Sequence, residues 1–232
     1  MSRVAILQSN YIPWKGYFDL IASVDKFILY DDMQYTKGDW RNRNKVKTSQ
    51  GTQWLTIPIL TNFGQKINET KVFGTEWAHK HLKSIELIYK KSSRFDSVFP
   101  WVRNLYEQTG ELKLLSEINF YFIKEICKKI EISTELIDSR QFKIEGIKSE
   151  ALISVLKQIG GVTSYLSGPA AKSYLDIQLF NQENIKVNWM DYSNYPEYNQ
   201  MYPPFEHSVS ILDLFFNEGE NAHRYLKNIS LA

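Results

Sequence analysis

Two adjacent carboxylates follow an apolar run near the amino terminus. Asp31 and Asp32 come directly after residues 27–30, Phe-Ile-Leu-Tyr, which have the character of a buried strand. Paired carboxylates at a strand end can hold Mg²⁺, act as a general base, or bind a sugar hydroxyl or an ammonium group. The alternative is a turn in which each aspartate caps its own backbone. The pattern favours function for one of the two, and leaves open which, because adjacent strand residues face opposite sides.

Two arginines follow at a spacing of two. Arg41 and Arg43 would point to one face of an extended segment, and Trp40 beside them offers a stacking surface. A guanidinium binds phosphate or carboxylate through paired hydrogen bonds. Lys45 and Lys47 continue the alternation, which also suits a solvated basic face. Four cations in seven residues favour an anion site, and the pyrophosphate of a nucleotide sugar fits it.

A later turn is a second place where an anion could bind. Ser167 and Gly168 precede Pro169, which is typical of the first position of a helix. Backbone N–H groups at a helix start favour an anion. A simple capped helix explains the same residues, and the sequence alone favours that explanation.

Histidine is the usual general base near neutral pH, and His207 is the best candidate here. It adjoins a Tyr- and Pro-rich loop and precedes Asp213 by about one and a half helical turns. His79 and His81 share an expected helix but lie on different faces. The lone cysteine, Cys127, is expected inside a buried helix, and no Cys/His cluster has zinc-ligand spacing. We therefore predict no metal site.

These residues must be positioned by the elements around them. An apolar run at residues 4–7, a polar loop, an amphipathic segment at 17–24 and the apolar run at 27–30 follow the order of a βαβ unit. In such units ligands bind at the loops that leave the carboxyl ends of the strands. Both loops here are richer in polar and aromatic residues than a connection requires, so we place the active site there.

The rest of the chain continues the alternation of strands and helices. We predict one α/β domain over residues 1–232, a mostly parallel sheet flanked by helices, with a helical insertion at about residues 75–130. The expected strands are 53–59, 133–137, 163–166 and 185–189, and the main expected helices are 111–130, 149–159, 208–217 and 220–228.

Composition limits the class of protein. The 232 residues are 43% hydrophobic and 23% charged, enough apolar content for an ordinary globular core. Aromatic residues make up 14%, which suits rings at a binding surface or an aromatic-rich core. The net charge of +2 and the lack of a basic tail argue against nucleic acid as a partner. No signal segment or run of about 18 apolar residues occurs, so we expect a cytoplasmic protein without a membrane span.

Several stretches of the sequence resemble the WbqC-like protein family. They are residues 8–18 (Gln-Ser-Asn-Tyr-Ile-Pro-Trp-Lys-Gly-Tyr-Phe), 31–35, 40–43, 54–58, 165–170 and 210–214. The likeness covers nearly the whole chain, and its opening motif is long and specific. One departure is Ser9, where the family usually has proline, which changes the stiffness of the turn more than its chemistry.

The resemblance implies a function. The family is associated with bacterial surface-polysaccharide (O-antigen) gene sets, and members have been assigned as glycine or aminoacyl transferases acting on amino sugars. It implies an amide formed between a sugar amine and a carboxylic acid, on a nucleotide-linked sugar. Asp32, Asp31 or His207 would then supply the base. The binding residues implied are Gln8, Tyr11, Trp14, Gln34, Trp40, Arg41, Arg43, Ser167 and Gly168.

The donor and the cofactor stay open. The first loop and the late Ser-Gly turn also resemble adenylyl-transferring folds, although the paired histidines of those folds are missing. If that likeness holds, ATP with Mg²⁺ would activate the acid and the enzyme would be a ligase; otherwise it would need an activated amino-acid or acyl donor. Other readings are a non-catalytic accessory protein that binds nucleotide sugars and a hydrolase that uses Mg²⁺ at Asp31 and Asp32. The oligomeric state is also open.

Overall fold

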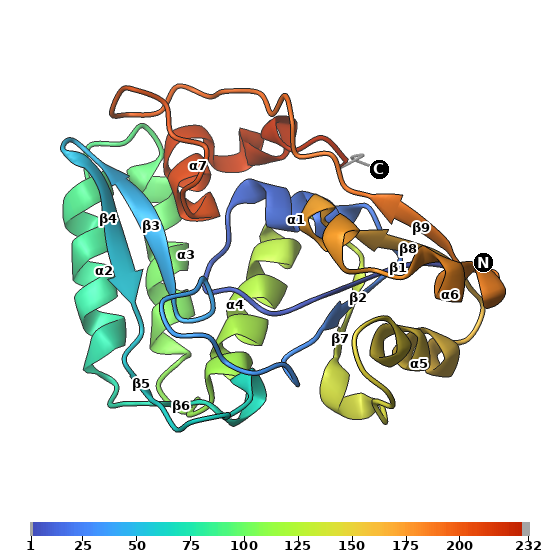
Figure 1. Cartoon of the computed structure of the whole chain (residues 1–232). Coiled ribbons are helices and arrows are strands. Elements are labelled where there is room, and N and C mark those ends of the chain that lie inside the picture. Colours follow the sequence, from blue (N-terminus) through green and yellow to red (C-terminus); the bar gives the residue numbers. More distant parts are fainter. Residues whose placement is uncertain (1, 229–232) are drawn as a thin grey trace.

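A five-stranded parallel sheet forms the centre of the protein. The computed structural model describes residues 2–228, and Figure 1 shows the sheet between two groups of helices. The strands lie in the order β7-β2-β1-β8-β9. Their bounds are β1 Ser2–Leu7, β2 Lys26–Leu29, β7 Glu135–Asp138, β8 Val162–Ser167 and β9 Lys186–Trp189. The prediction of an α/β fold with a mostly parallel sheet is confirmed.

Alternate side chains of the strands enter two separate cores. Ala5 and Phe27 belong to the larger core, with helices α1 (Lys15–Ala22) and α4 (Leu115–Lys129). Neighbouring positions such as Ile28 enter the smaller one. A strand covered on both faces must be apolar at consecutive positions, which explains the uninterrupted runs in the sequence.

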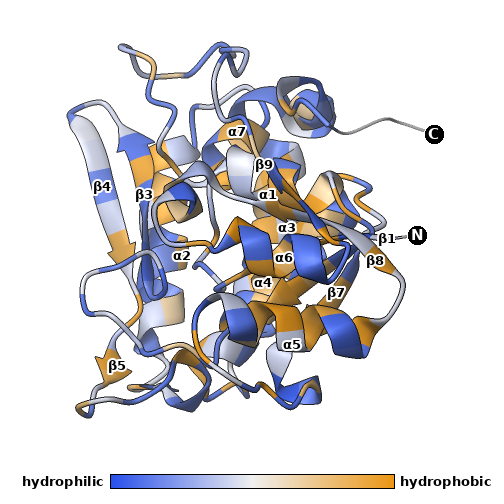
Figure 2. Cartoon of the chain, turned by 45° about the vertical axis from the view of Figure 1, so that its right-hand side comes forward, coloured by the Kyte–Doolittle hydropathy of each residue, from blue (hydrophilic) through white to orange (hydrophobic). Residues whose placement is uncertain are grey.

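Helices α5 (Ser149–Ile159) and α6 (Ile177–Gln182) cover the other face of the sheet. Figure 2 shows hydrophobic and hydrophilic bands alternating along α5, as expected for a helix with one buried side. The α5 helix ends at Gly160, whose φ of 72° is unfavourable for residues with a side chain. The predicted helix at 149–159, closed by glycine, is confirmed.

A long segment between β2 and β7 builds the side of the molecule opposite α5. Its strands form two small antiparallel pairs, β3 with β4 and β5 with β6, and its helices α2 and α3 lie behind the β3–β4 hairpin (Figure 1). Their bounds are β3 Arg43–Thr48, β4 Gly51–Thr56, β5 Ile59–Leu60, β6 Lys71–Val72, α2 Glu76–Tyr89 and α3 Phe95–Glu107. The strand expected at 53–59 therefore ends at Thr56 and pairs with β3 outside the parallel sheet.

The last part of the chain crosses the top of the molecule in Figure 1. Residues 190–209 form neither helix nor strand, and α7 (Ile211–Glu218) follows. Instead of the α-helix expected at 220–228, a 3₁₀ helix spans Gly219–Tyr225. Gly219 has a φ of 60°, which ends α7 and restarts the chain in a new direction. Within residues 2–228 no helix is long and apolar enough to cross a membrane.

The strand order creates a crevice at one edge of the sheet. From β1 the chain moves outward to β2 and β7, and it then returns to the other side of β1 for β8 and β9. Connections on the two sides run to opposite faces, so the carboxyl ends of β1 and β8 are left uncovered between them. Ligands of open α/β sheets bind at this switch point.

Candidate functional site

A pocket of about 340 Å³ lies at the switch point between β1 and β8. Leu7 and Gln8 line it from the end of β1, and Ser167 and Gly168 line it from the end of β8. Further walls come from Tyr30, Met33, Lys148, Leu152 and Tyr174. We call it the switch-point pocket. Its surface is mostly apolar, with polar groups at the strand ends.

The helix expected after the Ser167–Gly168 turn is a 3₁₀ helix and not an α-helix. A 3₁₀ helix covers only Pro169–Ser173, with proline at its first position as predicted. Five residues in this geometry give little of the summed dipole that an α-helix offers to an anion. Ser167 and Gly168 therefore contribute to the pocket as strand-end residues.

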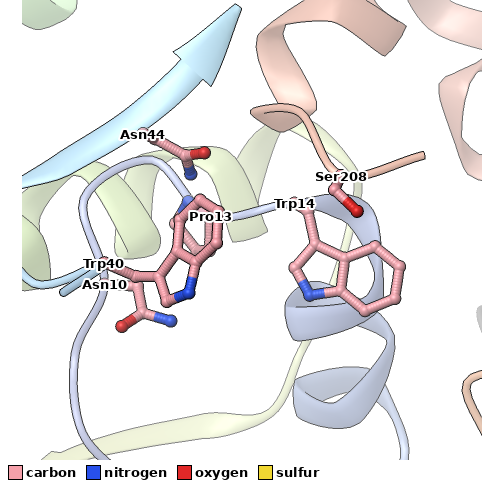
Figure 3. A pocket seen from close by; sticks show the side chains of 6 residues that line it. All are labelled: Asn10, Pro13, Trp14, Trp40, Asn44 and Ser208. Carbon is pink, nitrogen blue, oxygen red and sulfur yellow. The ribbon is translucent and has the colours of Figure 1, made fainter. Parts of the chain in front are cut away.

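A second pocket, of about 200 Å³, is built largely from loop residues. Figure 3 shows the indoles of Trp14 and Trp40 on either side of its opening, with Asn10 and Asn44 nearby and Ser208 reaching in from the late loop. We call it the aromatic pocket. Two rings and several amide or hydroxyl groups suit a ligand with apolar faces and a polar edge.

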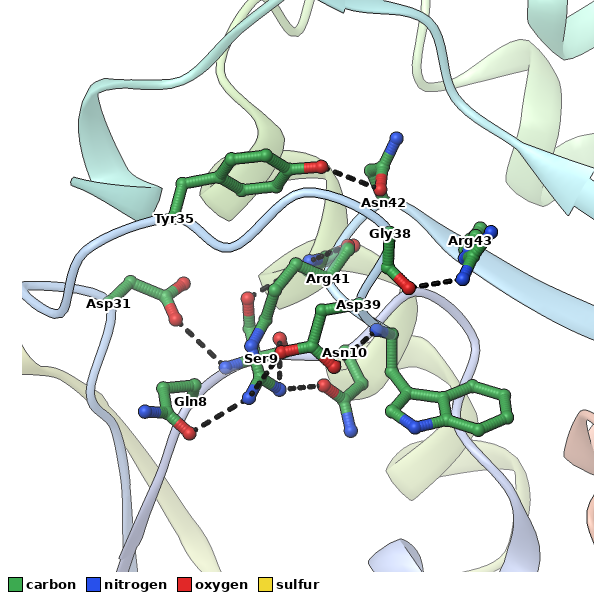
Figure 4. Close-up of polar contacts among 12 residues, drawn as sticks. Gln8, Ser9, Asn10, Asp31, Tyr35, Gly38, Asp39, Arg41, Asn42 and Arg43 are labelled. Carbon is green, nitrogen blue, oxygen red and sulfur yellow. Dashed lines mark hydrogen bonds and ion pairs between the residues drawn. The ribbon is translucent and has the colours of Figure 1, made fainter. Parts of the chain in front are cut away.

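One guanidinium connects the two pockets. Arg41 donates from Nη2 to Gln8 Oε1 at 3.0 Å and from Nη1 to Asn10 Oδ1 and the Ser9 carbonyl (Figure 4). Asp39 lies 3.5 Å from the same guanidinium. Because a guanidinium only donates, both amide oxygens must face Arg41. The NH₂ groups of Gln8, in the switch-point pocket, and Asn10, in the aromatic pocket, are thereby turned away from Arg41 and stay available as donors.

The loop between β1 and α1 is held in a strained shape. Ile12 has a φ of 38°, which is rare for a β-branched residue. Asn44 of β3 donates from Nδ2 to the carbonyl of Tyr11 at 3.0 Å and to that of Ile12 at 2.7 Å. The hairpin thus fixes the loop that carries Asn10 and Trp14 into the aromatic pocket.

The two aspartates have different surroundings. Asp31 is buried and accepts a hydrogen bond of 2.8 Å from the Ser9 backbone N–H, beside Arg41. Burial raises the pKa of Asp31, while the hydrogen bonds from Ser9 and the charge of Arg41 act in the opposite direction. Asp32 accepts from Ser139 Oγ at 2.7 Å and pairs with Lys66 at 3.4 Å. Asp31 therefore adjoins the residues that connect the pockets, and neither carboxylate is among the side chains lining the two pockets.

His207 and Asp213 are not brought together. The α7 helix begins at Ile211, so His207 lies outside it and helical spacing does not relate the two residues. His207 is exposed, with Nε2 3.9 Å from Glu197 Oε1. Asp213 is buried and accepts hydrogen bonds from Tyr89 at 2.9 Å and from Tyr198 and Gln200 at 2.6 Å each.

Tyr11 lies beneath the aromatic pocket rather than in it. Its ring is fully buried, and its hydroxyl is 2.9 Å from His81 Nδ1 and 2.5 Å from the Tyr106 hydroxyl. Burial lowers the pKa of His81 to about 4, so the ring is neutral near pH 7. His81 Nε2 then carries the proton donated to the Thr56 carbonyl at 3.2 Å, and Nδ1 accepts from Tyr11. Tyr11 supports the loop above it through this network.

The remaining predicted residues lie at the edges of the site. Gln34 is exposed and pairs through its backbone with Lys66. The Arg43 guanidinium stacks on Trp54 at 4.1 Å and donates to the Gly38 carbonyl. Trp54 in turn lies 5.3 Å from Trp40, between ring centroids. Arg43 is thus tied to the outer face of the hairpin, next to the aromatic pocket.

Residues 190–209 are anchored by buried charged groups. Lys15 Nζ donates to the Pro196 carbonyl at 2.6 Å, Tyr195 donates to Asp19 at 2.6 Å, and Asp213 holds Tyr198 as described. Lys15 also faces the rings of Tyr195, Tyr198 and Phe205. Burial lowers the pKa of Lys15 to about 8. These contacts place Ser208 at the aromatic pocket.

Sequence reasoning missed several residues that line the pockets. Asn10, Asn44 and Ser208 of the aromatic pocket and Lys148 of the switch-point pocket were not singled out. For Asn44 a signal existed, since it alternates with cations along an extended segment and so must face inward. Lys148 gives no such signal in the sequence. Among residues 2–228 no cluster of three His, Cys, Asp or Glu could hold a metal ion.

The strand order defines a doubly wound α/β protein, with a pocket at the carboxyl edge of its sheet, where proteins of this class bind ligands. The chain belongs to the WbqC-like protein family, whose profile matches residues 8–225. The resemblance seen in the sequence is thus confirmed. The chain is similar to the uncharacterized protein Rv1507c of Mycobacterium tuberculosis, with 48% identity over 231 residues and 98% of each chain covered. Comparison with solved structures gives no match.

Proposed function

We propose that this protein forms an amide on the amine of a nucleotide-linked sugar, as an aminoacyl (glycyl) transferase or ligase of surface-polysaccharide biosynthesis. The observation that carries the proposal is the pair of unlike pockets connected by Arg41. A nucleotide sugar has two unlike halves joined by a diphosphate, and each half matches one pocket.

The aromatic pocket takes the sugar. The apolar C–H faces of a pyranose stack on indole rings, here Trp14 and Trp40, while hydroxyl and amide substituents need hydrogen bonds. Asn10, whose NH₂ group is left free by Arg41, and Ser208 supply such groups. A ring entering between the indoles would present its edge to these residues.

The switch-point pocket takes the nucleoside. Its apolar walls suit a base and ribose, and its place at the ends of β1 and β8 is where open α/β sheets bind nucleotides. The diphosphate would then pass Gln8, which lines this pocket, and reach the sugar near Asn10.

The chemistry needs one base and one set of donors. The sugar ammonium gives up a proton, the amine nitrogen bonds to the acyl carbon, and the bond from that carbon to the donor's leaving group breaks. Asp31 is the base in this proposal, because burial raises its pKa and it lies beside Ser9 and Arg41, where the pockets meet. The NH₂ groups of Gln8 and Asn10 are the donors for the developing oxyanion.

A ligand panel followed by product analysis tests the proposal. Thermal unfolding of the purified protein is measured with UDP, dTDP, nucleotide-linked amino sugars, ATP with Mg²⁺, and acyl-coenzyme A. A ligand at about one hundred times its dissociation constant stabilises the protein by about 2.7 kcal/mol. Stabilisation by a nucleotide amino sugar, and a product heavier by one aminoacyl group in mass spectrometry, are expected. Stabilisation by ATP in addition would favour the ligase form, and no shift with any nucleotide contradicts the proposal.

A second candidate function is a non-catalytic protein that binds nucleotide sugars for other enzymes of the pathway. It is favoured by one observation, that Asp31, Asp32 and His207 are all absent from the linings of the two pockets. Binding of a nucleotide amino sugar without turnover, with any donor of the panel, would support this function over the first.

A further inference from the structure

Lys148 is the one charged side chain in the lining of the switch-point pocket. The other lining residues are apolar or uncharged. Lys148 is exposed, and within residues 2–228 its side chain makes no hydrogen bond or ion pair. Lysines nearby are engaged, since Lys143 pairs with Glu145 at 2.6 Å and Lys157 with Glu183 at 3.0 Å. An unneutralised cation at the rim of an otherwise uncharged pocket attracts an anionic ligand group.

The backbone of Lys148 is strained. Its φ of 51° and ψ of −119° fall in a region that residues with a side chain rarely adopt and that glycine adopts freely. Lys148 immediately precedes α5, whose residue Leu152 lines the same pocket. Glycine would relieve the strain at this position but would leave the pocket without a charge. Strain of this kind concentrates at ligand sites, where it fixes the direction of a side chain.

We propose that Lys148 binds the diphosphate of the nucleotide in the switch-point pocket. This inference rests on the proposed function, and it assigns the diphosphate contact to the residue that precedes α5 and lines the same pocket as Gln8. Arg41 is already committed to Gln8, Ser9 and Asn10, and Arg43 to Trp54 and Gly38. Neither arginine lines the switch-point pocket. The anion site that the sequence placed at those arginines is thus assigned to a lysine from a different part of the chain.

The inference is tested by calorimetric titration of UDP and of uridine into the full-length protein and its variants. Loss of one charged hydrogen bond in Lys148→Ala should weaken UDP binding by about tenfold or more, while uridine binding stays within a factor of about two. Lys148→Arg should keep UDP affinity near that of the wild type, because the charge remains. Lys143→Ala removes a neighbouring charge outside the pocket and should leave UDP binding unchanged.

Lys148→Gly separates binding from folding. It should weaken UDP binding as much as Lys148→Ala does, yet it should raise the midpoint of thermal unfolding, because glycine accepts this backbone conformation without strain. A damaged fold would lower both quantities together. UDP binding unchanged in Lys148→Ala overturns this inference and leaves the proposed function standing. If the wild type binds neither UDP nor dTDP, both the proposed function and this inference are overturned.

Discussion

The two pockets differ in what holds their walls. The switch-point pocket is made mainly from the ends of strands and from the turn that follows β8, with Leu152 of α5, and the sheet and its cores fix these elements in any case. The aromatic pocket is made largely from loops, and side-chain hydrogen bonds hold two of them in place. Asn44 holds the loop before α1, and Lys15 holds the late loop. The first pocket is thus a consequence of the fold, whereas the second depends on a few named side chains.

The largest effect is expected where the two pockets meet. Asp31→Asn keeps the shape of the carboxylate but removes the base, so turnover should fall by about 10²–10⁴-fold with nucleotide-sugar affinity nearly unchanged. Steady-state kinetics together with binding measurements would show this. Asp32→Asn, whose side chain contacts Ser139 and Lys66 instead, is the matched control and should lose far less. Equal losses in the two variants would remove Asp31 from the proposed role.

Arg41→Ala should damage both pockets at once. It leaves the oxygens of Gln8 and Asn10 without their donor, and so frees both amides to turn. Each amide then holds its ligand hydrogen bond less well, and such a bond is worth about 0.5–1.5 kcal/mol, so nucleotide-sugar affinity should fall by up to about 100-fold. Arg41→Lys should rescue little, because one ammonium cannot span the three acceptors. Calorimetry with UDP and with a UDP-linked amino sugar would reveal whether both halves of the ligand are affected; loss confined to one half contradicts the connecting role.

Acidification should lower the free energy of unfolding through His81, which supports the loop of the aromatic pocket. Burial lowers the pKa of His81 to about 4 from an unfolded value near 6.5. Between these values the unfolded chain binds a proton that the folded protein does not, so stability is complete above about pH 6.5 and falls as the pH drops toward 4. The shift corresponds to a loss of up to roughly 3 kcal/mol. Urea unfolding at several pH values would measure it.

A variant isolates the contribution of His81 to this pH dependence. His81→Gln removes the titrating ring but keeps a side chain that can hydrogen-bond to Tyr11 or Thr56. The variant should be less stable than the wild type at pH 7, and its stability should change less between pH 6.5 and 4. Identical slopes in the two proteins would assign the acid sensitivity to other groups.

The same contrast between pockets explains what the sequence could predict. The parallel strands can be predicted from the sequence as apolar runs, because both of their faces are buried. Once the strands are predicted, the residues at their carboxyl ends are located too. Gln8, Ser167 and Gly168, all singled out from the sequence, are such residues, and they line the switch-point pocket. An extended segment was predicted at Arg41 and Arg43, but its pairing with β4 was not. The carbonyl partners of the buried Asn44, in the loop at residues 11–12, were not predicted either. Such partners are invisible to any local pattern.

Interactions over long distances in the sequence account for the rest. Tyr11 has the type of a stacking residue, but His81 and Tyr106, 70 and 95 positions away, draw its hydroxyl into the core. His207 was related to Asp213 by helical spacing, which fails because the helix starts only at Ile211. Lys148 is distinguished by its backbone angles, and no sequence pattern predicts those angles.

The smallest expected effect distinguishes the aromatic pocket from the surface beside it. Trp40 and Trp54 are neighbours on the hairpin side, with ring centroids 5.3 Å apart and similar exposure of 38% and 39%, but only Trp40 lines the pocket. Loss of one stacking ring is worth about 0.5–1.5 kcal/mol, so Trp40→Ala should weaken a UDP-linked amino sugar by up to about tenfold. UDP alone should bind the variant as it binds the wild type, since its nucleoside occupies the other pocket. Trp54→Ala loses a ring of the same size from the same surface and should leave both ligands unaffected. If Trp54→Ala weakens sugar binding as much as Trp40→Ala, the sugar lies on the outer face of the hairpin, and its assignment to the aromatic pocket is wrong.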